Sequence, residues 1–278
     1  MILSGKAKLA GVLGWPVGHS RSPRLHGYWL EQHHIDGAYV PLAVRPEDFA
    51  DVFHALPRMG FAGANVTIPH KEKALALADH VEPLARRIGA VNTLVVRENG
   101  SIDGRNTDAF GFLENMRHAI PGFKAATGPA VVIGAGGASR AVVAALLDDG
   151  VPEVRLINRT RHRAEEVAAA LGGAIEVIAW EERADALAGA ALLVNTTSLG
   201  MTGQPPLDLA LDALPLEAHV NDIVYVPLET PLLAEARQRG HRAVDGLGML
   251  LHQARAGFHA WFGVMPSVTE DFRRFVKD

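Results

Sequence analysis

The sequence contains no cysteine, which excludes disulfide bonds, thiolate metal sites and a cysteine nucleophile. It also has no run of 18 apolar residues, the length that a membrane-spanning helix needs. No basic run interleaved with aromatic residues marks a nucleic-acid surface. The N-terminus lacks the charged-then-apolar order of a signal peptide, because Gly11 and Pro16 interrupt the run that begins at Leu9. We therefore expect a cytoplasmic protein with neither a membrane nor a nucleic-acid partner.

The charge is nearly balanced, with 27 Lys and Arg residues against 31 Asp and Glu residues. Any site for an anionic ligand must therefore be built locally. Hydrophobic residues make up 48% of the 278 residues, which is enough for sizeable cores, and this length favours two domains over one. The chain has 13 histidines, of which His33, His34 and His162 are interpreted as surface residues. None has the spacing of a metal ligand set, so we predict no metal.

The chain divides near residue 108 into two halves, and each alternates apolar runs with amphipathic stretches. This alternation predicts mainly parallel α/β layers, with two α/β lobes around a cleft that can hold a ligand. Asn99 and Gly100 form a turn signal in the first half. The strands expected there are Ala7–Leu13, Ala38–Val44, Gly63–Val66 and Thr93–Arg97, and the helices are Ser22–Gln32, Pro46–Leu56 and Lys71–Ala78. The strands expected in the second half are Pro129–Ile133, Glu153–Ile157, Ala174–Ala179, Ala191–Asn195, His219–Val224 and Arg242–Val244, with helices between them that include Arg163–Leu171, and a final helix at Met249–Trp261.

The most informative segment is Val131–Ala141, where a buried strand leads through a glycine turn into a helix. This order builds an anion site, because glycines let the backbone approach a pyrophosphate and the first amides of the helix point at it. The third position of the dinucleotide fingerprint is Ser139 rather than glycine, which weakens the plain pattern. The predicted cradle consists of Gly134, Ala135, Gly136, Gly137 and Ala138.

The next strand ends in Asn158, Arg159 and Thr160, and Arg163 follows. A cofactor with a free ribose 2′-hydroxyl usually meets an acidic residue at this distance from the glycines. A carboxylate would repel a 2′-phosphate, whereas two guanidinium groups would hold one. This corner therefore predicts NADP rather than NAD.

Three polar clusters in the first half follow predicted strands. For each of them, a purely structural or solvent-exposed role is the alternative to a functional one. Ser20 and Ser22 offer two hydroxyls, but Ser22 before Pro23 is also a plain helix N-cap. Asn65, Thr67 and Lys71 follow a strand's carboxyl end, where open α/β sheets keep their ligands, although a lone lysine is more often solvated. Asp108 lies at the junction of the halves, where it or Thr107 could simply cap a helix.

Together these segments resemble the shikimate dehydrogenase family over nearly the whole chain. One departure is Gly27, where the family often has asparagine. The nine blocks that carry the resemblance are His19–Pro23, Asn65–Lys71, Gly89–Thr93, Gly104–Asp108, Gly134–Ala138, Asn158–Thr160, Asn195–Met201, Asp222–Tyr225 and Gly246–Gln253.

The resemblance implies reversible reduction of 3-dehydroshikimate to shikimate with NADPH. Lys71 and Asp108 correspond to the family's catalytic pair, and a close Lys–Asp pair titrates as a unit, so the holder of the mobile proton stays open. It implies that Ser20, Ser22 and Tyr225 hold the substrate carboxylate. Asn65, Thr67, Asn92 and Gln253 would bind the other polar groups of the ring. Ile223 and Gly246 would flank the nicotinamide, while Thr196 and Thr197 could line the cofactor or merely build their loop.

The resemblance also implies a domain organisation: a substrate-binding catalytic domain at 1–108, an NADP-binding Rossmann domain at 109–245, and a helical segment at 246–278 that packs back on the first domain. A homodimer is a family-level expectation. Two alternatives stay open: a quinate/shikimate dehydrogenase that uses NAD, which Arg159 and Arg163 oppose, and an NADP-binding regulator without turnover, which would need neither Lys71 nor Asp108.

Overall fold

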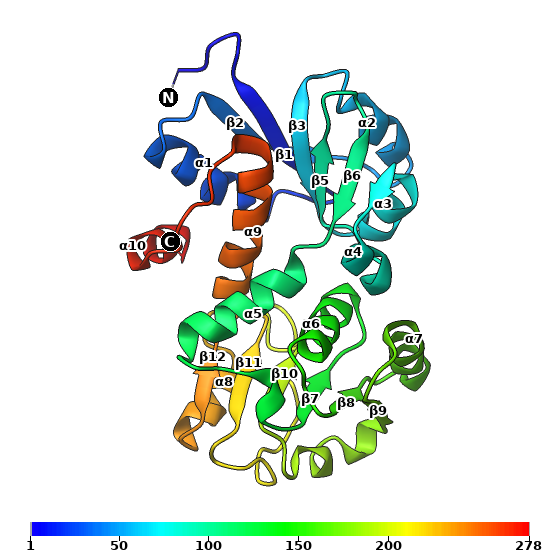
Figure 1. The fold of residues 1–278 in the computed structure, drawn as a ribbon. Helices are drawn as coiled ribbons and strands as arrows, with labels where there is room; N and C mark the ends of the chain where they lie inside the picture. Colours follow the sequence, from blue (N-terminus) through cyan, green and yellow to red (C-terminus); the bar gives the residue numbers. More distant parts are fainter. Residues whose placement is uncertain (1, 278) are drawn as a thin grey trace. The chain divides into compact units, whose positions relative to one another are not determined.

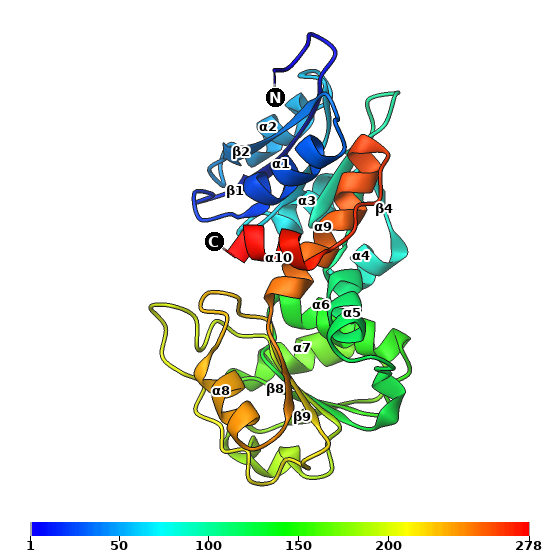
Figure 2. The same cartoon turned by 90° about the vertical axis from the view of Figure 1, so that its left-hand side faces the viewer.

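The computed structural model describes residues 2–277, and the chain folds into two compact units (Figure 1). The first unit combines the residues up to Thr107 with those from Leu251 on, and the second consists of Asp108–Leu250. Each unit is built on one six-stranded sheet, and Figure 2 gives a second view of the fold, turned by 90°. The predicted fold class, two α/β lobes of which the second is Rossmann-like, is confirmed. Within residues 2–277, no helix is both long and apolar enough to cross a membrane.

The sheet of the first unit has the strand order β2-β1-β3-β5-β6-β4. Strand β1 pairs in parallel with β2 and β3, but β5 pairs antiparallel with β3 and β6. The layer is therefore mixed rather than mainly parallel, because the turn at Asn99 and Gly100 joins β5 to β6 as a hairpin, and a hairpin is antiparallel by necessity. The strands are β1 (Lys8–Gly14), β2 (Gly37–Ala43), β3 (Phe61–Val66), β4 (His80–Val81), β5 (Thr93–Val96) and β6 (Ile102–Arg105).

Helices cover both faces of this sheet, and the alternation of side chains along each strand decides which residue faces which layer. Leu13, Ala64, Val66 and Leu94 belong to a core with helices α2 (Phe49–Ala55), α3 (Lys71–Leu77) and α4 (Pro83–Ile88). The intervening residues of the same strands, Asn65 among them, face the opposite layer. That layer consists of α1 (Ser22–Gln32), α10 (Glu270–Lys277) and the part of α9 (Leu247–Phe262) that belongs to this unit.

The C-terminal segment completes the first unit. Trp261 of α9 donates from Nε1 to the Leu94 carbonyl of β5 at 2.8 Å. This close approach requires Gly63 on β3, because a Cβ there would overlap both the Trp261 ring and the Leu94 carbonyl. Trp29 of α1 stacks on Phe272 of α10 with ring centroids 4.6 Å apart. Residues from both ends of the chain therefore share one core.

The second unit has the strand order β12-β11-β10-β7-β8-β9, and all pairs are parallel. In an all-parallel sheet, ligands bind at the carboxyl ends of the strands, near the point where the strand order reverses. That reversal lies between β7 and β10 here. The strands are β7 (Ala130–Ile133), β8 (Val154–Ile157), β9 (Ile175–Ile178), β10 (Leu192–Asn195), β11 (His219–Asp222) and β12 (Arg242–Val244), and the helices are α5 (Asp108–Ala119), α6 (Gly137–Asp148), α7 (Arg161–Leu171) and α8 (Pro231–Gln238).

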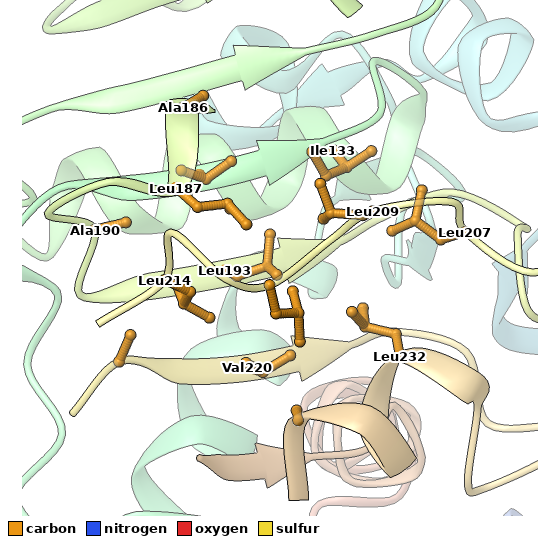
Figure 3. Close-up of a cluster of buried hydrophobic side chains, with 14 of the residues drawn as sticks. Ile133, Ala186, Leu187, Ala190, Leu193, Leu207, Leu209, Leu214, Val220 and Leu232 are labelled. Carbon is orange, nitrogen blue, oxygen red and sulfur yellow. The ribbon is translucent and has the colours of Figure 1, made fainter. Parts of the chain in front are cut away.

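One face of the second sheet carries a continuous apolar core (Figure 3). Ile133, Leu193 and Val220 come from three neighbouring strands and meet Leu232 of α8 and Leu209 of a long loop. Burial of a leucine or isoleucine side chain is worth about 1.5–3 kcal/mol relative to exposure. This core fixes the strands whose carboxyl-end loops carry the predicted cofactor residues.

Most predicted elements are present, with ends that differ by a few residues. The predicted strand Arg242–Val244 coincides with β12, and the helix expected from Arg163 begins at Arg161 as α7. The two-residue strand β4 (His80–Val81) was not predicted, because periodicity needs several residues to be read. Nor was helix α10 (Glu270–Lys277), which buries Phe272 and Val276 on one face.

Candidate active site

The glycine turn joins β7 to α6 in the second unit. Gly134 has φ +115°, and a Cβ there would lie 2.5 Å from Thr196 Oγ1, so glycine is required. A Cβ on Gly136 or Gly137 would meet no atom within 4 Å, and Gly136 caps α6 without a side-chain hydrogen bond. Both glycines thus leave open space beside the start of the helix, where an anion cradle needs room for its ligand.

Ser139 explains the departure from the glycine fingerprint. Its hydroxyl is buried and donates to the Gly134 carbonyl at 2.6 Å. The side chain therefore closes the turn from within the helix, a role for which glycine has no atoms. Serine in place of glycine at position 139 therefore adds a hydrogen bond that stabilises the turn. It does not change the backbone amides of the proposed cradle.

The corner between β8 and α7 carries the predicted 2′-phosphate residues. Asn158 donates from Nδ2 to the Thr160 carbonyl at 2.8 Å, which fixes the turn. Arg159 and Arg163 are exposed on either side of the helix start. Arg161 lies between them in sequence but pairs with Glu165 at 2.9 Å. Two guanidinium groups at the start of one helix suit a phosphate ligand.

The loops after β10 and β11 are tied together by a buried polar cluster. Asp222 accepts hydrogen bonds from Asn195 Nδ2 at 3.0 Å, the Thr230 hydroxyl at 2.7 Å and the Val224 amide at 3.0 Å. Burial raises the pKa of this carboxyl, and the three donors oppose the shift. The cluster fixes the backbone that carries Ile223 and Tyr225, both of which are half-buried.

Two threonines and one glycine complete the strand ends of this unit. The Thr196 hydroxyl donates to the Ile133 carbonyl and the Thr197 hydroxyl to Asn195 Oδ1, each at 2.7 Å. Both hydroxyls therefore stabilise the loop that contains them. This agrees with the alternative that Thr196 and Thr197 build their loop. Gly246 packs so closely on Ile223 that a Cβ would overlap the Ile223 carbonyl.

In the first unit, Ser20 and Ser22 stand at the start of α1. The Ser22 amide donates to Ser20 Oγ at 3.3 Å. Ser22 is the first residue of the helix rather than its cap, and the capping position, Arg21, makes no side-chain cap bond. The capping interpretation of Ser22 is therefore wrong, because the helix begins one residue earlier than an N-cap at Ser22 would require. Ser20 is half-buried and Ser22 is 8% exposed.

Asn65 of β3 is the centre of a buried network. Its Oδ1 accepts from the Tyr39 hydroxyl at 2.7 Å, and its Nδ2 donates to the Asn92 carbonyl and to Thr93 Oγ1, each at 3.2 Å. Burial raises the pKa of Tyr39 well above its usual value, an effect that the neighbouring Ser22 hydroxyl opposes. His26 stacks on Tyr39 with centroids 4.0 Å apart.

A second network joins Asn92 to the C-terminal segment. Asn92 Oδ1 accepts from the Thr107 amide at 2.9 Å and from the Thr93 hydroxyl at 2.9 Å. Asn92 Nδ2 lies 3.1 Å from Thr107 Oγ1, which in turn lies 3.2 Å from Gln253 Oε1. Gln253 on α9 thus shares this network with Asn92, although the two residues lie far apart in the sequence.

Lys71 is the first residue of α3 and is half-buried. Its backbone is fixed from both sides, because its carbonyl accepts the Val91 amide at 3.0 Å and the preceding His70 ring bonds to the Val44 carbonyl at 2.8 Å. Burial lowers the pKa of His70. Thr67, three residues before His70, accepts the His70 amide at 2.9 Å through its carbonyl and is half-buried.

Asp108 opens α5 in the second unit and is 9% exposed. It follows Thr107 directly in the chain, so the boundary between the units falls between two residues of one motif.

The structure thus groups seven predicted residues in the first unit and the remainder in the second. The first group is Ser20, Ser22, Asn65, Thr67, Lys71, Asn92 and Gln253.

Sequence reasoning did not identify three polar residues of these networks. Tyr39 lies in a strand that reads as ordinary core, and no spacing signal distinguishes it. Thr93 and Thr107 belong to the motifs Gly89–Thr93 and Gly104–Asp108. Their place in these motifs could have marked them as candidate site residues. His33, His34 and His162 are exposed. In the described part of the chain, no group of three or more His, Asp or Glu residues could hold a metal ion.

Comparison with known proteins covers the whole chain. Residues 12–94 match the family model of the shikimate dehydrogenase substrate binding domain. Residues 117–201 match the model "Shikimate / quinate 5-dehydrogenase", and residues 246–271 match the shikimate 5′-dehydrogenase C-terminal domain. Shikimate dehydrogenase (NADP(+)) from Paramagnetospirillum magneticum is 68% identical over 274 residues, which cover 99% of both chains. The protein of the same description from Rhodospirillum rubrum is 60% identical over 279 residues, again covering 99% of both chains.

Solved structures agree with the fold. Shikimate 5-dehydrogenase from Thermus thermophilus, in complex with NADP(H) and shikimate, has a TM-score of 0.84 and 38% identity over 97% of both chains. Quinate dehydrogenase from Corynebacterium glutamicum, in complex with NAD, has a TM-score of 0.90 and 31% identity over 97% of this chain and 98% of that one. The architecture is thus shared by enzymes that differ in substrate and cofactor. Three family models in order and close relatives over the full length show that the chain belongs to the shikimate dehydrogenase family.

Proposed function

We infer that the protein is an NADP-dependent shikimate dehydrogenase, an oxidoreductase that interconverts 3-dehydroshikimate and shikimate in aromatic amino acid biosynthesis. The observation that carries this conclusion is 68% identity over 274 residues to a shikimate dehydrogenase (NADP(+)). In this proposal the first unit binds the substrate and the second unit binds NADP.

NADP is the cofactor, and residues of the second unit fit it. The open positions at Gly136 and Gly137 leave room for a pyrophosphate against the uncapped start of α6. Gly134, Ala135 and Ala138 complete this cradle. Ile223 and Gly246, packed on each other, would flank the nicotinamide. When bound, NADPH supplies a hydride to the substrate's carbonyl carbon.

The 2′-phosphate separates NADP from NAD, and the corner at the start of α7 fits that group. Arg159 and Arg163 are exposed there, Asn158 and Thr160 shape the turn, and positions 158–160 hold no carboxylate. This argues against the NAD-using quinate/shikimate alternative. The similarity to an NAD-bound quinate dehydrogenase, at 31% identity, reflects the shared fold.

The polar residues of the first unit suit a small ring with a carboxylate and hydroxyls. We assign the carboxylate to Ser20 and Ser22, with Tyr225 of the second unit. Asn65, Thr67, Asn92 and Gln253 bind the ring's other polar groups. A site of this kind rejects analogues that lack those groups, because its own buried polar atoms would lose their partners.

Lys71 and Asp108 are the proposed catalytic pair. Lys71 either donates a proton from Nζ to the carbonyl oxygen or polarises that oxygen, and in the reverse direction it accepts the hydroxyl proton. Asp108 orients the Lys71 ammonium and the reacting hydroxyl. General acid–base catalysis of this kind contributes about 10²–10⁴-fold to the rate. A regulator without turnover would need neither residue.

An assay at about 340 nm tests the proposal, because the reduced nicotinamide of NADPH absorbs there. We expect shikimate with NADP⁺ to give turnover, and quinate or NAD⁺ to be poor replacements. Turnover of quinate with NAD⁺ at a comparable kcat/KM would favour the quinate/shikimate alternative. Binding of NADP⁺ without turnover of either acid would favour a regulator.

We further propose that the enzyme acts in the cytoplasm as a homodimer. The support for this is the family resemblance. Light scattering after size-exclusion chromatography measures the molar mass directly, and a mass near that of one 29.7 kDa chain would contradict the dimer.

A further inference from the structure

Tyr39 reaches a substrate-binding residue across an intervening strand. It lies on β2, Asn65 lies on β3, and β1 runs between them. Tyr39 pairs in register with Ala10 of β1, and Asn65 pairs with Val12 of the same strand, so all four side chains point to one face. Because Ala10 is small and fully buried, the Tyr39 ring can pass over it, and its hydroxyl meets Asn65 Oδ1 at 2.7 Å.

The partners of Asn65 fix which way its carboxamide faces. The Asn92 carbonyl at 3.2 Å can only accept, so the atom beside it must be Nδ2. Thr93 Oγ1 takes the other Nδ2 hydrogen, since the single Thr93 hydroxyl proton is donated to Asn92 Oδ1 at 2.9 Å. Both N–H groups of Asn65 are therefore committed to the protein, and the oxygen faces Tyr39.

We propose that Tyr39 is a positioning residue for the substrate: with Thr93, it holds Asn65 so that this side chain can only accept a hydrogen bond from a ligand. The inference rests on the proposed function, in which Asn65 binds the ring. A carboxamide held in this way selects a hydroxyl group, which donates, and disfavours a carbonyl or ether oxygen at the same place.

The reacting oxygen of the substrate cannot be the group that Asn65 binds. That oxygen is a carbonyl in 3-dehydroshikimate and a hydroxyl in shikimate, so an acceptor-only partner would oppose one of the two. Asn65 therefore takes a hydroxyl that stays unchanged through the reaction. Such a contact is equally strong in the bound substrate and in the transition state, so its loss raises KM and leaves kcat nearly unchanged.

The experiment compares Tyr39→Phe with the wild type in shikimate oxidation by NADP⁺. Phenylalanine keeps the ring that stacks on His26 at 4.0 Å and removes only the hydroxyl. We expect KM for shikimate to rise about fivefold, the change that loss of a net hydrogen-bond contribution of about 1 kcal/mol produces. We expect kcat to stay within about twofold and KM for NADP⁺ to be unchanged.

Tyr28→Phe is the matched control, because it makes the same chemical change in the same unit at a ring that packs on Phe272 and Phe275. We expect wild-type kinetics from it. The double variant Tyr39→Phe with Asn65→Ala should bind shikimate as weakly as Asn65→Ala alone, because Tyr39 acts through Asn65.

Thr93→Val tests whether Thr93 also fixes the orientation of the Asn65 side chain. This test does not depend on whether Tyr39→Phe folds. It removes the acceptor for Asn65 Nδ2 at a residue that is 1% exposed. We expect it to raise KM for shikimate, and Thr93→Ser to restore it. With active wild-type enzyme, an unchanged KM in both the Tyr39 and Thr93 variants, or additive effects in the double variant, would overturn this inference alone. A wild type that fails to oxidise shikimate would overturn the proposed function and this inference together.

Discussion

The backbone at Lys71, the proposed proton donor, is fixed by hydrogen bonds on both sides. The Val91 amide bonds to its carbonyl and the preceding His70 ring is anchored on the Val44 carbonyl. The half-buried Lys71 side chain therefore starts from a defined position on the backbone. Proton transfer requires that the donor reach the reacting oxygen within hydrogen-bond distance, and a fixed origin restricts where the ammonium group can lie.

We predict that Lys71→Ala lowers kcat by about 10²–10⁴-fold and changes the dissociation constant for shikimate by less than about tenfold, since several other polar groups hold the ring. Initial rates and calorimetry measure the two effects. Lys73→Ala on the same helix is the control, because Lys73 Nζ bonds to the exposed Pro46 carbonyl and should not affect turnover. Near-normal turnover of Lys71→Ala would refute the assignment.

His26 is a buried histidine that the fold holds neutral. It is fully buried between aromatic rings, with Phe258 on the far side from Tyr39. Burial lowers its pKa from 6.5 to about 3, and the neighbouring Asn65 side chain opposes this shift. The unfolded chain therefore binds a proton at this histidine below about pH 6.5 and the folded chain does not, so stability falls as the pH falls through that window.

We predict that this single residue costs the folded state about 3 kcal/mol between pH 6.5 and pH 4, since one pKa unit corresponds to about 1.36 kcal/mol. His26→Phe should flatten the pH dependence of urea unfolding by about one bound proton in that range. His162→Gln, at an exposed histidine, should leave the dependence as it is. If His26→Phe and the wild type lose stability in parallel on acidification, His26 titrates normally in the fold.

At the scale of elements, the proposed cofactor site lies at the carboxyl ends of parallel strands of the second unit. The turns after β7 and β8, and the loops after β10 and β11, each carry proposed cofactor residues, while the strands themselves are buried. The buried bonds of Asp222 link the last two loops. Specific binding therefore depends on short loops that a rigid sheet holds in place.

We predict that the wild type prefers NADP⁺ over NAD⁺ by at least about a hundredfold in kcat/KM. Two charge-assisted contacts contribute about 1.5–3 kcal/mol each, less if they are not additive, and about 1.4 kcal/mol corresponds to tenfold. Arg159→Ala with Arg163→Ala should remove most of this preference by raising KM for NADP⁺. Arg161→Ala, which breaks a pair with Glu165, removes a neighbouring charge as the control. Equal use of both cofactors by the wild type would contradict the assignment of this corner.

At the scale of the whole molecule, the two ends of the chain meet in one unit. The aromatic rings of α1 pack on those of α9 and α10, so residues near position 29 and position 272 share a core. Gln253 joins the Asn92 network through the same return of the chain. The first unit is consequently discontinuous in sequence, and its stability depends on the C-terminal helices.

We predict that Phe272→Ala destabilises the first unit by about 3–5 kcal/mol, the usual cost of removing a fully buried phenylalanine. Phe272 is 0% exposed, whereas Phe275 on the same helix is 37% exposed, so Phe275→Ala should cost clearly less. Urea unfolding followed by tryptophan fluorescence compares them, since Trp29 stacks on Phe272. Equal effects of the two substitutions would show that α10 is not part of the core.

Local sequence was sufficient for the features that local chemistry decides. Strand–glycine–helix order predicted the cradle at Gly134, the basic residues at Arg159 and Arg163 predicted the preference for a phosphate-bearing cofactor, and alternating apolar runs predicted two α/β lobes. These features need only a few consecutive residues, because backbone freedom, charge and periodicity act over short spans. Nine ordered motifs then identified the family.

Tertiary structure alone decided how those parts combine. The antiparallel pairing of β3 with β5 and the pairing of the two-residue β4 with β6 join segments that lie far apart in the chain. The bond from Tyr39 to Asn65 depends on strand order, since a third strand with the small Ala10 lies between them. Periodicity shows which face of a strand is buried but carries no information on which strand lies beside it, and hydrogen bonds across a sheet are therefore visible only once the strands are paired.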